Sequence, residues 1–201
     1  MPGFDVIPYN DLEALRLALE NKDVAGFLVE PIQGEAGIVV PDKGYLFQAK
    51  AMCEAANVLF IADEIQTGLC RTGKMLCCDH ENIKPDILLL GKALSGGTFP
   101  VSAVLSRDEV MLTIKPGEHG STFGGSPLAS IVATESLKVL VDENMAENAI
   151  EMGELLRAGL AAIQSPLISE IRGMGLMNAV VINHQNPDAG WLICETFMKN
   201  G

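Results

Sequence analysis

Short apolar runs alternate with segments of helical periodicity in the first half of the chain. Four such runs predict strands, at residues 25–29, 58–62, 87–90 and 101–105. Between them, residues 10–19, with Asn10 as the expected cap, and residues 45–56 predict helices. Strands that alternate with helices imply an α/β fold with a largely parallel sheet. Because residues 87–90 are all apolar, we expect that strand to be buried on both faces.

The second half of the chain has a different pattern. From residue 126 to 160 it becomes helical, and five large apolar residues are predicted core positions: Val139, Leu140, Leu155, Leu156 and Leu160. After Pro166, the segment 168–182 ends in a further apolar strand. We expect residues 1–160 to form a large domain and residues 161–201 to begin a smaller α/β domain.

Two residues of opposite charge follow two of the predicted strands. Asp63 ends one strand and Lys92 follows the next, and the carboxyl ends of parallel strands meet at one edge of a sheet. Apolar surroundings would lower the pKa of Lys92 and favour the neutral amine that attacks carbonyl groups. Pyridoxal phosphate needs such a pair, a lysine for its aldehyde and an acid for its ring nitrogen. Taken singly, Lys92 also fits a strand-end lysine lying along apolar surface, and Asp63 a helix N-cap.

Four motifs around these residues have the order and spacing of a known family. They are VEPIQGEAG at 29–37, ADEIQTG at 62–68, LGKALSGG at 90–97 and GEHGSTFGG at 117–125. With them the chain resembles the pyridoxal-phosphate-dependent aminotransferases that act on ω-amino groups, in particular the ornithine aminotransferases, from about Phe4 to about Ile182. The resemblance implies the three-layer α/β large domain of fold type I, with a largely parallel sheet, and pyridoxal phosphate as cofactor.

The resemblance also implies roles for single residues. Lys92 would bind the cofactor covalently and move protons, and Asp63 would pair with the ring nitrogen. Gln66 would donate a hydrogen bond near the phenolic oxygen of the cofactor, although it also fits a polar turn residue. Ser121 and Thr122 would hold phosphate oxygens of the neighbouring subunit's cofactor, which implies a homodimer or a larger homo-oligomer. Without the other motifs, an ordinary capped loop explains these two hydroxyls equally well.

Glu35 resembles a glutamate that pairs with an arginine and so masks it during one half-reaction; a surface-loop carboxylate is the alternative. The implied reaction moves the δ-amino group of L-ornithine to 2-oxoglutarate and gives glutamate 5-semialdehyde and glutamate, which feed proline or arginine metabolism. The partners are therefore small amino acids and 2-oxo acids. Acetylornithine and 4-aminobutyrate aminotransferases share the aspartate and the lysine, so they remain alternatives.

Composition excludes several classes of function. The net charge of −12 over 201 residues argues against a nucleic-acid partner. No apolar run approaches the roughly 20 residues of a membrane helix, so no membrane partner is expected. The five cysteines contain no Cys-x-x-Cys pair and the three histidines are far apart, so we expect neither a disulfide framework nor a metal site.

Parts of the family pattern do not occur in these 201 residues. They are a glycine-rich phosphate loop, an aromatic residue that stacks on the cofactor, both substrate arginines and most of the C-terminal domain. We therefore expect a fragment or truncated isoform, and a non-catalytic chain that pairs with intact subunits is an alternative function. Animal relatives lie in the mitochondrial matrix; because no import signal precedes Met1, a cytoplasmic location stays open.

Overall fold

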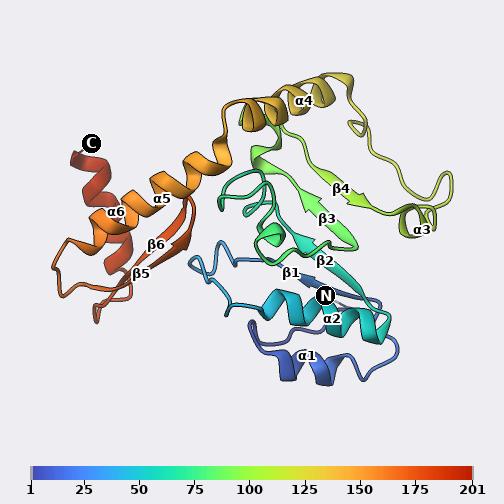
Figure 1. Ribbon diagram of the computed structural model, residues 1–201, viewed down its shortest axis with the longest axis horizontal. Coiled ribbons are helices and arrows are strands. Elements are labelled where there is room, and N and C mark those ends of the chain that lie inside the picture. Colours follow the sequence, from blue (N-terminus) through green and yellow to red (C-terminus); the bar gives the residue numbers. More distant parts are fainter. Residues whose placement is uncertain (1, 201) are drawn as a thin grey trace.

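The computed structural model describes residues 2–200, whose centre is a four-stranded sheet (Figure 1). The strand order is β1 (Gly26–Val29), β2 (Leu59–Asp63), β3 (Ile87–Leu90) and β4 (Ala103–Ser106). The β1–β2 and β2–β3 pairs are parallel, whereas β4 runs antiparallel to β3. The predicted α/β class with a largely parallel sheet is thus confirmed.

Helices and a second sheet complete the chain. The remaining elements are α1 (Leu12–Ala18), α2 (Tyr45–Ala56), the 3-10 helices η1 (Cys77–Glu81) and η2 (Lys92–Ser95), α3 (Asp108–Met111), α4 (Pro127–Asp142), α5 (Met145–Ala161), the antiparallel hairpin β5 (Ile168–Met174) and β6 (Met177–Ile182), and α6 (Ala189–Asn200). No helix within residues 2–200 is both long and apolar enough to cross a bilayer. The predicted helix 45–56 and strand 87–90 have the predicted bounds.

The N-cap of the first helix lies one residue later than predicted. Its N-cap is Asp11, whose Oδ1 accepts a hydrogen bond from the Ala14 N–H at 2.9 Å. Asn10 instead lies in the left-handed region, with φ of 62°. The prediction that Asn10 caps the helix is therefore wrong, because the backbone turns at Asn10 before the helix starts.

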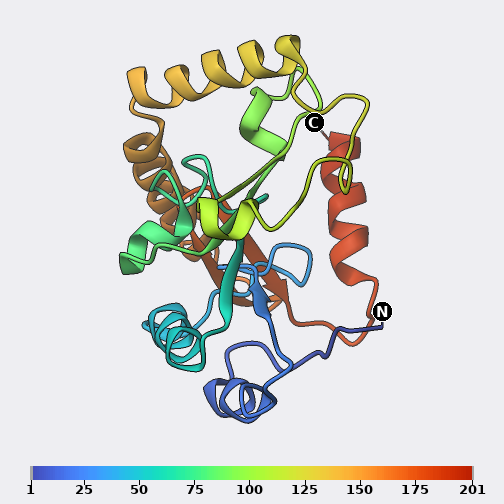
Figure 2. The same cartoon turned by 90° about the vertical axis from the view of Figure 1, so that its right-hand side faces the viewer.

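One face of the sheet, here called the inner face, packs against the helices. At β1 and β2 it presents Val29, Phe60 and Ala62, which form one apolar cluster with residues of α1 and α2. At β3 it presents Leu90, which lies in a second cluster with Leu94 and with apolar residues of α4. In Figure 2, α1 and α2 lie at the bottom of the view and α4 lies at the top. Burial of these residues supplies the apolar free energy that holds the sheet and the helices together.

The other face is here called the open face. It carries Leu28, Ile61, Asp63, Leu89 and Val104, because paired residues of neighbouring strands lie on the same face, as do residues two apart in one strand. Leu28 is 50% exposed and Val104 is 57% exposed. The prediction that the strand 87–90 is buried on both faces is wrong for the described residues, since Leu90 alone is fully buried. The physical reason is that the helices of residues 2–200 build their apolar clusters on the inner face.

Three of the predicted core positions in the helical region are exposed. Val139 is 45%, Leu155 65% and Leu156 46% exposed, so their predicted burial is wrong, whereas Leu140 packs in the α4 cluster. The helix α5 makes its buried contacts with small residues instead, and the Gly175 carbonyl leaves no room for a side chain at Gly153. Helical periodicity identified an apolar stripe but not the side of the helix that packs.

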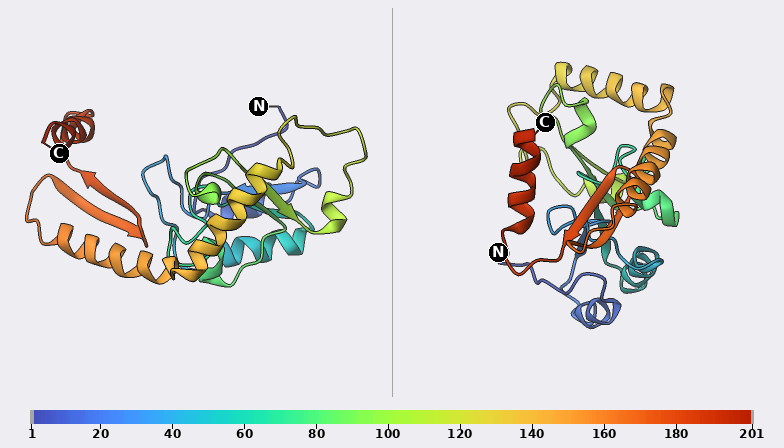
Figure 3. Two further views of the ribbon diagram at one scale, coloured as in Figure 1. Left: turned by 90° about the horizontal axis from the view of Figure 1, so that it is seen from above. Right: turned by 90° about the vertical axis from the view of Figure 1, so that its left-hand side faces the viewer.

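The hairpin β5–β6 lies beside the loops of the first sheet, at one end of the molecule (Figure 3). The Leu176 N–H donates to the Arg71 carbonyl at 3.0 Å, and Arg157 Nη1 donates to the Gly175 carbonyl at 3.0 Å. Arg172 donates through Nη2 to the Gly37 carbonyl at 2.8 Å. The contacts of Leu176 with Arg71 and of Arg172 with Gly37 join segments more than 100 residues apart in the chain, and the Arg157 contact joins α5 to the hairpin.

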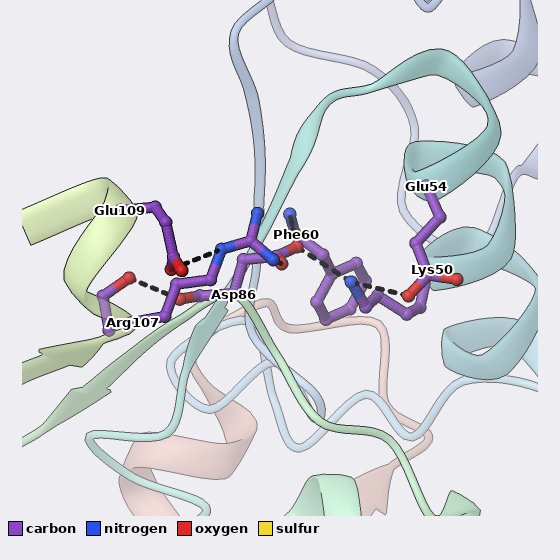
Figure 4. Close-up of polar contacts among 7 residues, drawn as sticks. Lys50, Glu54, Phe60, Asp86, Arg107 and Glu109 are labelled. Atoms are coloured by element: carbon purple, nitrogen blue, oxygen red, sulfur yellow. Dashed lines mark hydrogen bonds and ion pairs between the residues drawn. The ribbon is translucent and has the colours of Figure 1, made fainter.

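A polar cluster closes the amino end of β3 (Figure 4). Asp86 Oδ2 accepts hydrogen bonds from Lys50 Nζ at 2.8 Å and from the Phe60 N–H at 2.9 Å. Arg107 Nη1 lies 3.5 Å from Asp86 Oδ1. The Asp86 and Lys50 side chains are only 11% and 14% exposed. Asp86 therefore ties α2, β2 and the segment after β4 to one buried carboxylate.

Candidate active site

The strand register places Asp63 and Lys92 at the same edge of the sheet. Asp63 ends β2 beside Leu89 of β3, and Lys92 follows Leu89 by three residues. The Glu64 N–H donates to the Leu89 carbonyl at 3.1 Å, so the two strand ends stay joined beyond Asp63. Asp63 Oδ1 accepts from the Ile65 N–H at 3.0 Å, and no second hydrogen bond to this carboxylate comes from residues 2–200.

Lys92 begins η2 in a left-handed conformation, with φ of 42°. Its side chain is exposed, so the apolar burial predicted around its amine is wrong. The reason lies in the helical turn that follows, which buries Leu94 and Ser95 against α4 and leaves Lys92 on the outside. Within residues 2–200 the Lys92 amine has no hydrogen-bond or ion-pair partner, and this leaves it accessible to a ligand.

Gln66 and Glu35 meet across two loops. Gln66 Nε2 donates to Glu35 Oε1 at 3.1 Å. A Cβ added at Gly34 would lie 2.5 Å from Gln66 Oε1, so the Gln66 amide packs directly on the backbone there. The partner of Glu35 in this chain is thus a glutamine. If Glu35 masks an arginine during one half-reaction, that arginine is not among residues 2–200 in this structure.

The Glu35 loop is held in place by a residue that the sequence did not single out for this purpose. Arg172 Nε and Nη2 both donate to the Gly37 carbonyl, at 3.1 and 2.8 Å. The bonded loop contains Gly37 and Ile38 at positive φ, 104° and 55°. Because Ile38 is strained in that conformation, the arginine clamp helps to keep the loop in its observed form.

Ser121 and Thr122 lie in the exposed loop between α3 and α4. They are not among the residues that line the cavity beside Lys92. One chain therefore does not bring these hydroxyls to Lys92, and their predicted role at a neighbouring subunit stays a prediction.

A cavity of about 1090 Å³ opens beside Lys92. Ile65 and Gln66 line it from the turn after β2, Lys92 and Gly97 from η2 and the segment after it, and Arg71 from the loop that contacts the hairpin. Nothing lies within 4 Å of a Cβ built at Gly97, so the cavity is roomy there. An amine, an amide and a guanidinium thus line one space, together with the Glu135 carboxylate and apolar residues of α4.

Glu64 is a buried carboxylate that sequence reasoning passed over. It is 1% exposed and accepts hydrogen bonds from Thr67 Oγ1 at 2.6 Å, the Cys77 N–H at 2.9 Å and the Cys78 N–H at 2.8 Å. It thereby fixes the turn that carries Asp63 and Gln66 to the start of η1. The only signal in the sequence is an acid directly after Asp63, and its partners lie up to 14 residues away.

The cysteines beside Glu64 are held as thiols. Burial first, and then the Glu64 charge, raises the pKa of Cys77 to about 12. Burial and the same carboxylate also raise the pKa of Cys78. These groups are therefore poor nucleophiles at neutral pH. Among residues 2–200 no group of three or more His, Cys, Asp or Glu side chains is arranged to hold a metal ion.

Comparison with known proteins identifies the family. Residues 5–201 match the family model described as aminotransferase class-III. The chain belongs to the class-III aminotransferases. It is 57% identical over 201 residues to the mitochondrial ornithine aminotransferase of Rattus norvegicus, covering 100% of this chain and 46% of that relative. This class-III chain thus spans about half the length of the curated relatives it matches.

Two solved structures show the same fold. An ornithine aminotransferase from Toxoplasma gondii, described with partial occupancy of PLP at its active site, is 54% identical with a TM-score of 0.89, and the match covers 91% of this chain and 44% of that one. An acetylornithine aminotransferase from Elizabethkingia anophelis is 51% identical with a TM-score of 0.96, covering 100% and 54%. The predicted relationship to ornithine aminotransferases is confirmed.

Class-III aminotransferases depend on pyridoxal phosphate. The residues at the sheet edge fit this group in three respects. The Lys92 amine is free of protein partners, Asp63 keeps an oxygen without a hydrogen bond from residues 2–200, and Gln66 lines the cavity with Lys92. A lysine, an acid and a donor amide are the groups that the aldehyde, ring nitrogen and phenolic oxygen require.

Proposed function

We propose that the complete protein is an aminotransferase that moves the δ-amino group of L-ornithine to 2-oxoglutarate, giving glutamate 5-semialdehyde and glutamate. The observation that carries this proposal is the placement of Asp63 and Lys92 at the ends of neighbouring parallel strands, in a chain 57% identical to a named ornithine aminotransferase. The substrates are small molecules, as for any aminotransferase.

In this proposal Lys92 would hold pyridoxal phosphate covalently, Asp63 would pair with its ring nitrogen and Gln66 would donate to its phenolic oxygen. When bound, the cofactor withdraws electrons from the carbon that carries the amino group. The Lys92 amine would be the general base and acid at that carbon, because none of the residues 2–200 forms a hydrogen bond or ion pair with it. The Asp63 carboxylate would accept a hydrogen bond from the ring nitrogen of the cofactor.

The remaining predicted residues act at a distance from Lys92. Ser121 and Thr122 would bind phosphate oxygens of a neighbouring subunit's cofactor, and their exposed loop supports that assignment. The active form would then be a homodimer or larger homo-oligomer. Glu35 would gate the second substrate; its hydrogen bond from Gln66, a residue that lines the cavity, supports that assignment.

Covalent labelling tests the cofactor site in this chain. The chain is mixed with pyridoxal phosphate, reduced with borohydride and mapped by peptide mass spectrometry. We expect the label on Lys92, its loss in Lys92→Ala, and full labelling in Lys74→Ala, which removes an exposed lysine outside the cavity. Labelling of other lysines with none on Lys92 would contradict the proposal.

An acetylornithine substrate is the second candidate, because the Elizabethkingia anophelis enzyme of that name has a TM-score of 0.96 to this chain. Turnover by the full-length protein with L-ornithine, N-acetylornithine and 4-aminobutyrate separates the candidates. We expect the highest kcat/KM with L-ornithine, and a preference for N-acetylornithine would reverse the assignment.

A further proposed role of these 201 residues is that of a partner for intact subunits. The half-exposed Leu28 and Val104 of the open face support it, since such apolar surface is normally covered in α/β proteins. Size exclusion of a mixture with a full-length homologue tests this role, and the absence of co-elution removes it.

We also propose a boundary near residue 160 between a large and a small domain. A mitochondrial location is proposed as well, as in the name of the rat relative.

A further inference from the structure

We propose that Arg172 is a positioning residue, which keeps Glu35 against Gln66 by holding the loop 34–38 on the β5–β6 hairpin. This inference rests on the proposed function and adds to it a residue that lies outside the cavity lining. Arg172 is part of β5, and its Nε and Nη2 both donate to the Gly37 carbonyl, at 3.1 and 2.8 Å. Hydrogen bonds from a charged donor are stronger than those between neutral groups, so this contact ties the loop to the hairpin.

The peptide bonded by Arg172 is the strained part of the loop. The Gly37 carbonyl belongs to the peptide bond between Gly37 and Ile38, whose φ values are 104° and 55°. Positive φ costs a β-branched residue such as Ile38 free energy, so this conformation persists only where its surroundings hold it. The N–H groups of both residues donate to the Gly34 carbonyl, at 3.0 and 3.1 Å, which closes a tight turn around Glu35. Arg172 holds that turn from outside.

Apolar side chains bring the hairpin onto the same loop. Met177 of β6 is buried in a cluster with Ile32. Ile38 and Met174 of β5 pack against the same cluster. Apolar contacts have no directional preference, so they keep the loop near the hairpin without fixing its orientation. The two guanidinium hydrogen bonds supply that orientation.

The position of Glu35 decides which way the Gln66 amide faces. Glu35 Oε1 accepts a hydrogen bond from Gln66 Nε2 at 3.1 Å. Because a carboxylate only accepts, this bond keeps the amide nitrogen toward Glu35 and fixes the orientation of a side chain that lines the cavity. A Cβ added at Gly34 would lie 2.5 Å from Gln66 Oε1, so the loop backbone and the amide are in direct contact. A shift of the loop would therefore turn the amide as well.

Hydrogen exchange of the complete protein tests the clamp. Mass spectrometry follows the peptide that contains residues 34–40 in the wild type and in three variants. Arg172→Gln removes the charged donors. Glu170→Gln removes only the ion pair that Arg172 makes at 3.0 Å, and Arg157→Gln removes the hydrogen bonds between α5 and the hairpin turn. We expect exchange of the loop to be about tenfold faster in Arg172→Gln and unchanged in the other two variants.

Two outcomes would overturn the inference. One is loop exchange at the wild-type rate in Arg172→Gln. The other is equal acceleration in Arg157→Gln, which would mean a loosened hairpin rather than a lost clamp. Circular dichroism confirms the folding of each variant. If Arg172→Gln does not fold, Arg172→Lys decides, because it keeps one charged donor in place of two: faster loop exchange supports the clamp and the wild-type rate contradicts it.

A double-mutant cycle on turnover by the complete protein connects the clamp to the reaction. The ratio of kcat/KM for L-ornithine to that for 2-oxoglutarate is measured in Arg172→Gln, Glu35→Gln and the double variant. If Arg172 acts through Glu35, both single variants shift this ratio about fivefold in the same direction, and the double variant equals Glu35→Gln. Additive shifts overturn the inference. Absence of turnover in the wild type removes the proposed function, whereas the loop exchange still decides whether Arg172 holds the loop.

Discussion

The charged residues at the two ends of the central sheet differ in how many protein partners they have. At the amino end of β3, Asp86 accepts from Lys50 and the Phe60 N–H and lies near Arg107 (Figure 4). At the carboxyl end of β2, Asp63 accepts from one backbone N–H, and Lys92 has no partner within residues 2–200. A charge with several protein partners stabilises the fold, whereas a charge with few partners remains available to a ligand.

The same contrast separates two consecutive residues. Glu64 points into the protein, where it is 1% exposed and accepts three hydrogen bonds, while Asp63 lies on the open face. Of two consecutive acids at the end of a strand, one can thus stabilise the fold while the other remains available to bind a ligand. If this division is right, substitutions at the saturated carboxylates should lower stability, and substitution at Asp63 should not.

The largest effect is expected at Glu64. Glu64→Ala leaves the buried N–H groups of Cys77 and Cys78 without acceptors, so we expect a loss of about 4 kcal/mol in the free energy of unfolding. Urea unfolding measures it. Glu151→Gln, on the exposed surface of α5 and without a polar partner among residues 2–200, is the control and should change stability by less than about 0.5 kcal/mol. If Glu64→Ala lowers the free energy of unfolding no more than the control does, the buried carboxylate does not stabilise the fold as proposed.

A smaller loss is expected at Asp86. Asp86→Asn removes a charge that faces Lys50 and Arg107 in a mostly buried site, and we expect a loss of about 2–3 kcal/mol. Glu54→Gln removes the other carboxylate that pairs with Lys50, but Glu54 is 64% exposed, so its loss should stay below about 1 kcal/mol. Equal losses in the two variants would mean that burial does not distinguish them.

The pH dependence of stability sharpens the Asp86 prediction. Burial alone raises the pKa of Asp86, but the hydrogen bonds from Lys50 and the Phe60 N–H and the charges of Lys50 and Arg107 outweigh it, so the pKa is lowered. The unfolded chain, in which the pKa is about 4, then binds more protons in acid than the folded chain does. The contribution of Asp86 is therefore present above about pH 4 and lost as the pH falls through the folded pKa.

Urea midpoints between pH 7 and pH 2 test this sign. The stability difference between wild type and Asp86→Asn should be largest near pH 7 and should shrink as the pH falls through the lowered pKa of Asp86 in the folded chain. A difference that stays constant over this range would show that the ion pair is not its source.

The sequence predicted the strands and the edge at which they present Asp63 and Lys92, because apolar periodicity and strand ends are local properties. It did not predict the role of Glu64, since an acid after a strand has the same appearance whether it faces water or bonds the Cys77 and Cys78 N–H groups. Nor did it predict the exposure of Lys92, which depends on the side of η2 that α4 covers. The packing of α5 through Gly153 was missed for a similar reason, because apolar patterns mark large residues rather than close backbone contacts.

The smallest effect on stability, and the sharpest test of the comparison, is expected at Asp63. Asp63→Asn keeps an Oδ1 that can accept from the Ile65 N–H, so the free energy of unfolding should change by less than about 1 kcal/mol. The uncharged amide cannot hold a proton on the ring nitrogen of pyridoxal phosphate. Labelling at Lys92 should therefore continue while the visible absorbance and the affinity of the bound cofactor change. If Asp63→Asn instead lowers stability as much as Asp86→Asn and leaves the spectrum unaltered, Asp63 belongs with the structural carboxylates, and the carboxyl end of the sheet loses its distinction from the amino end.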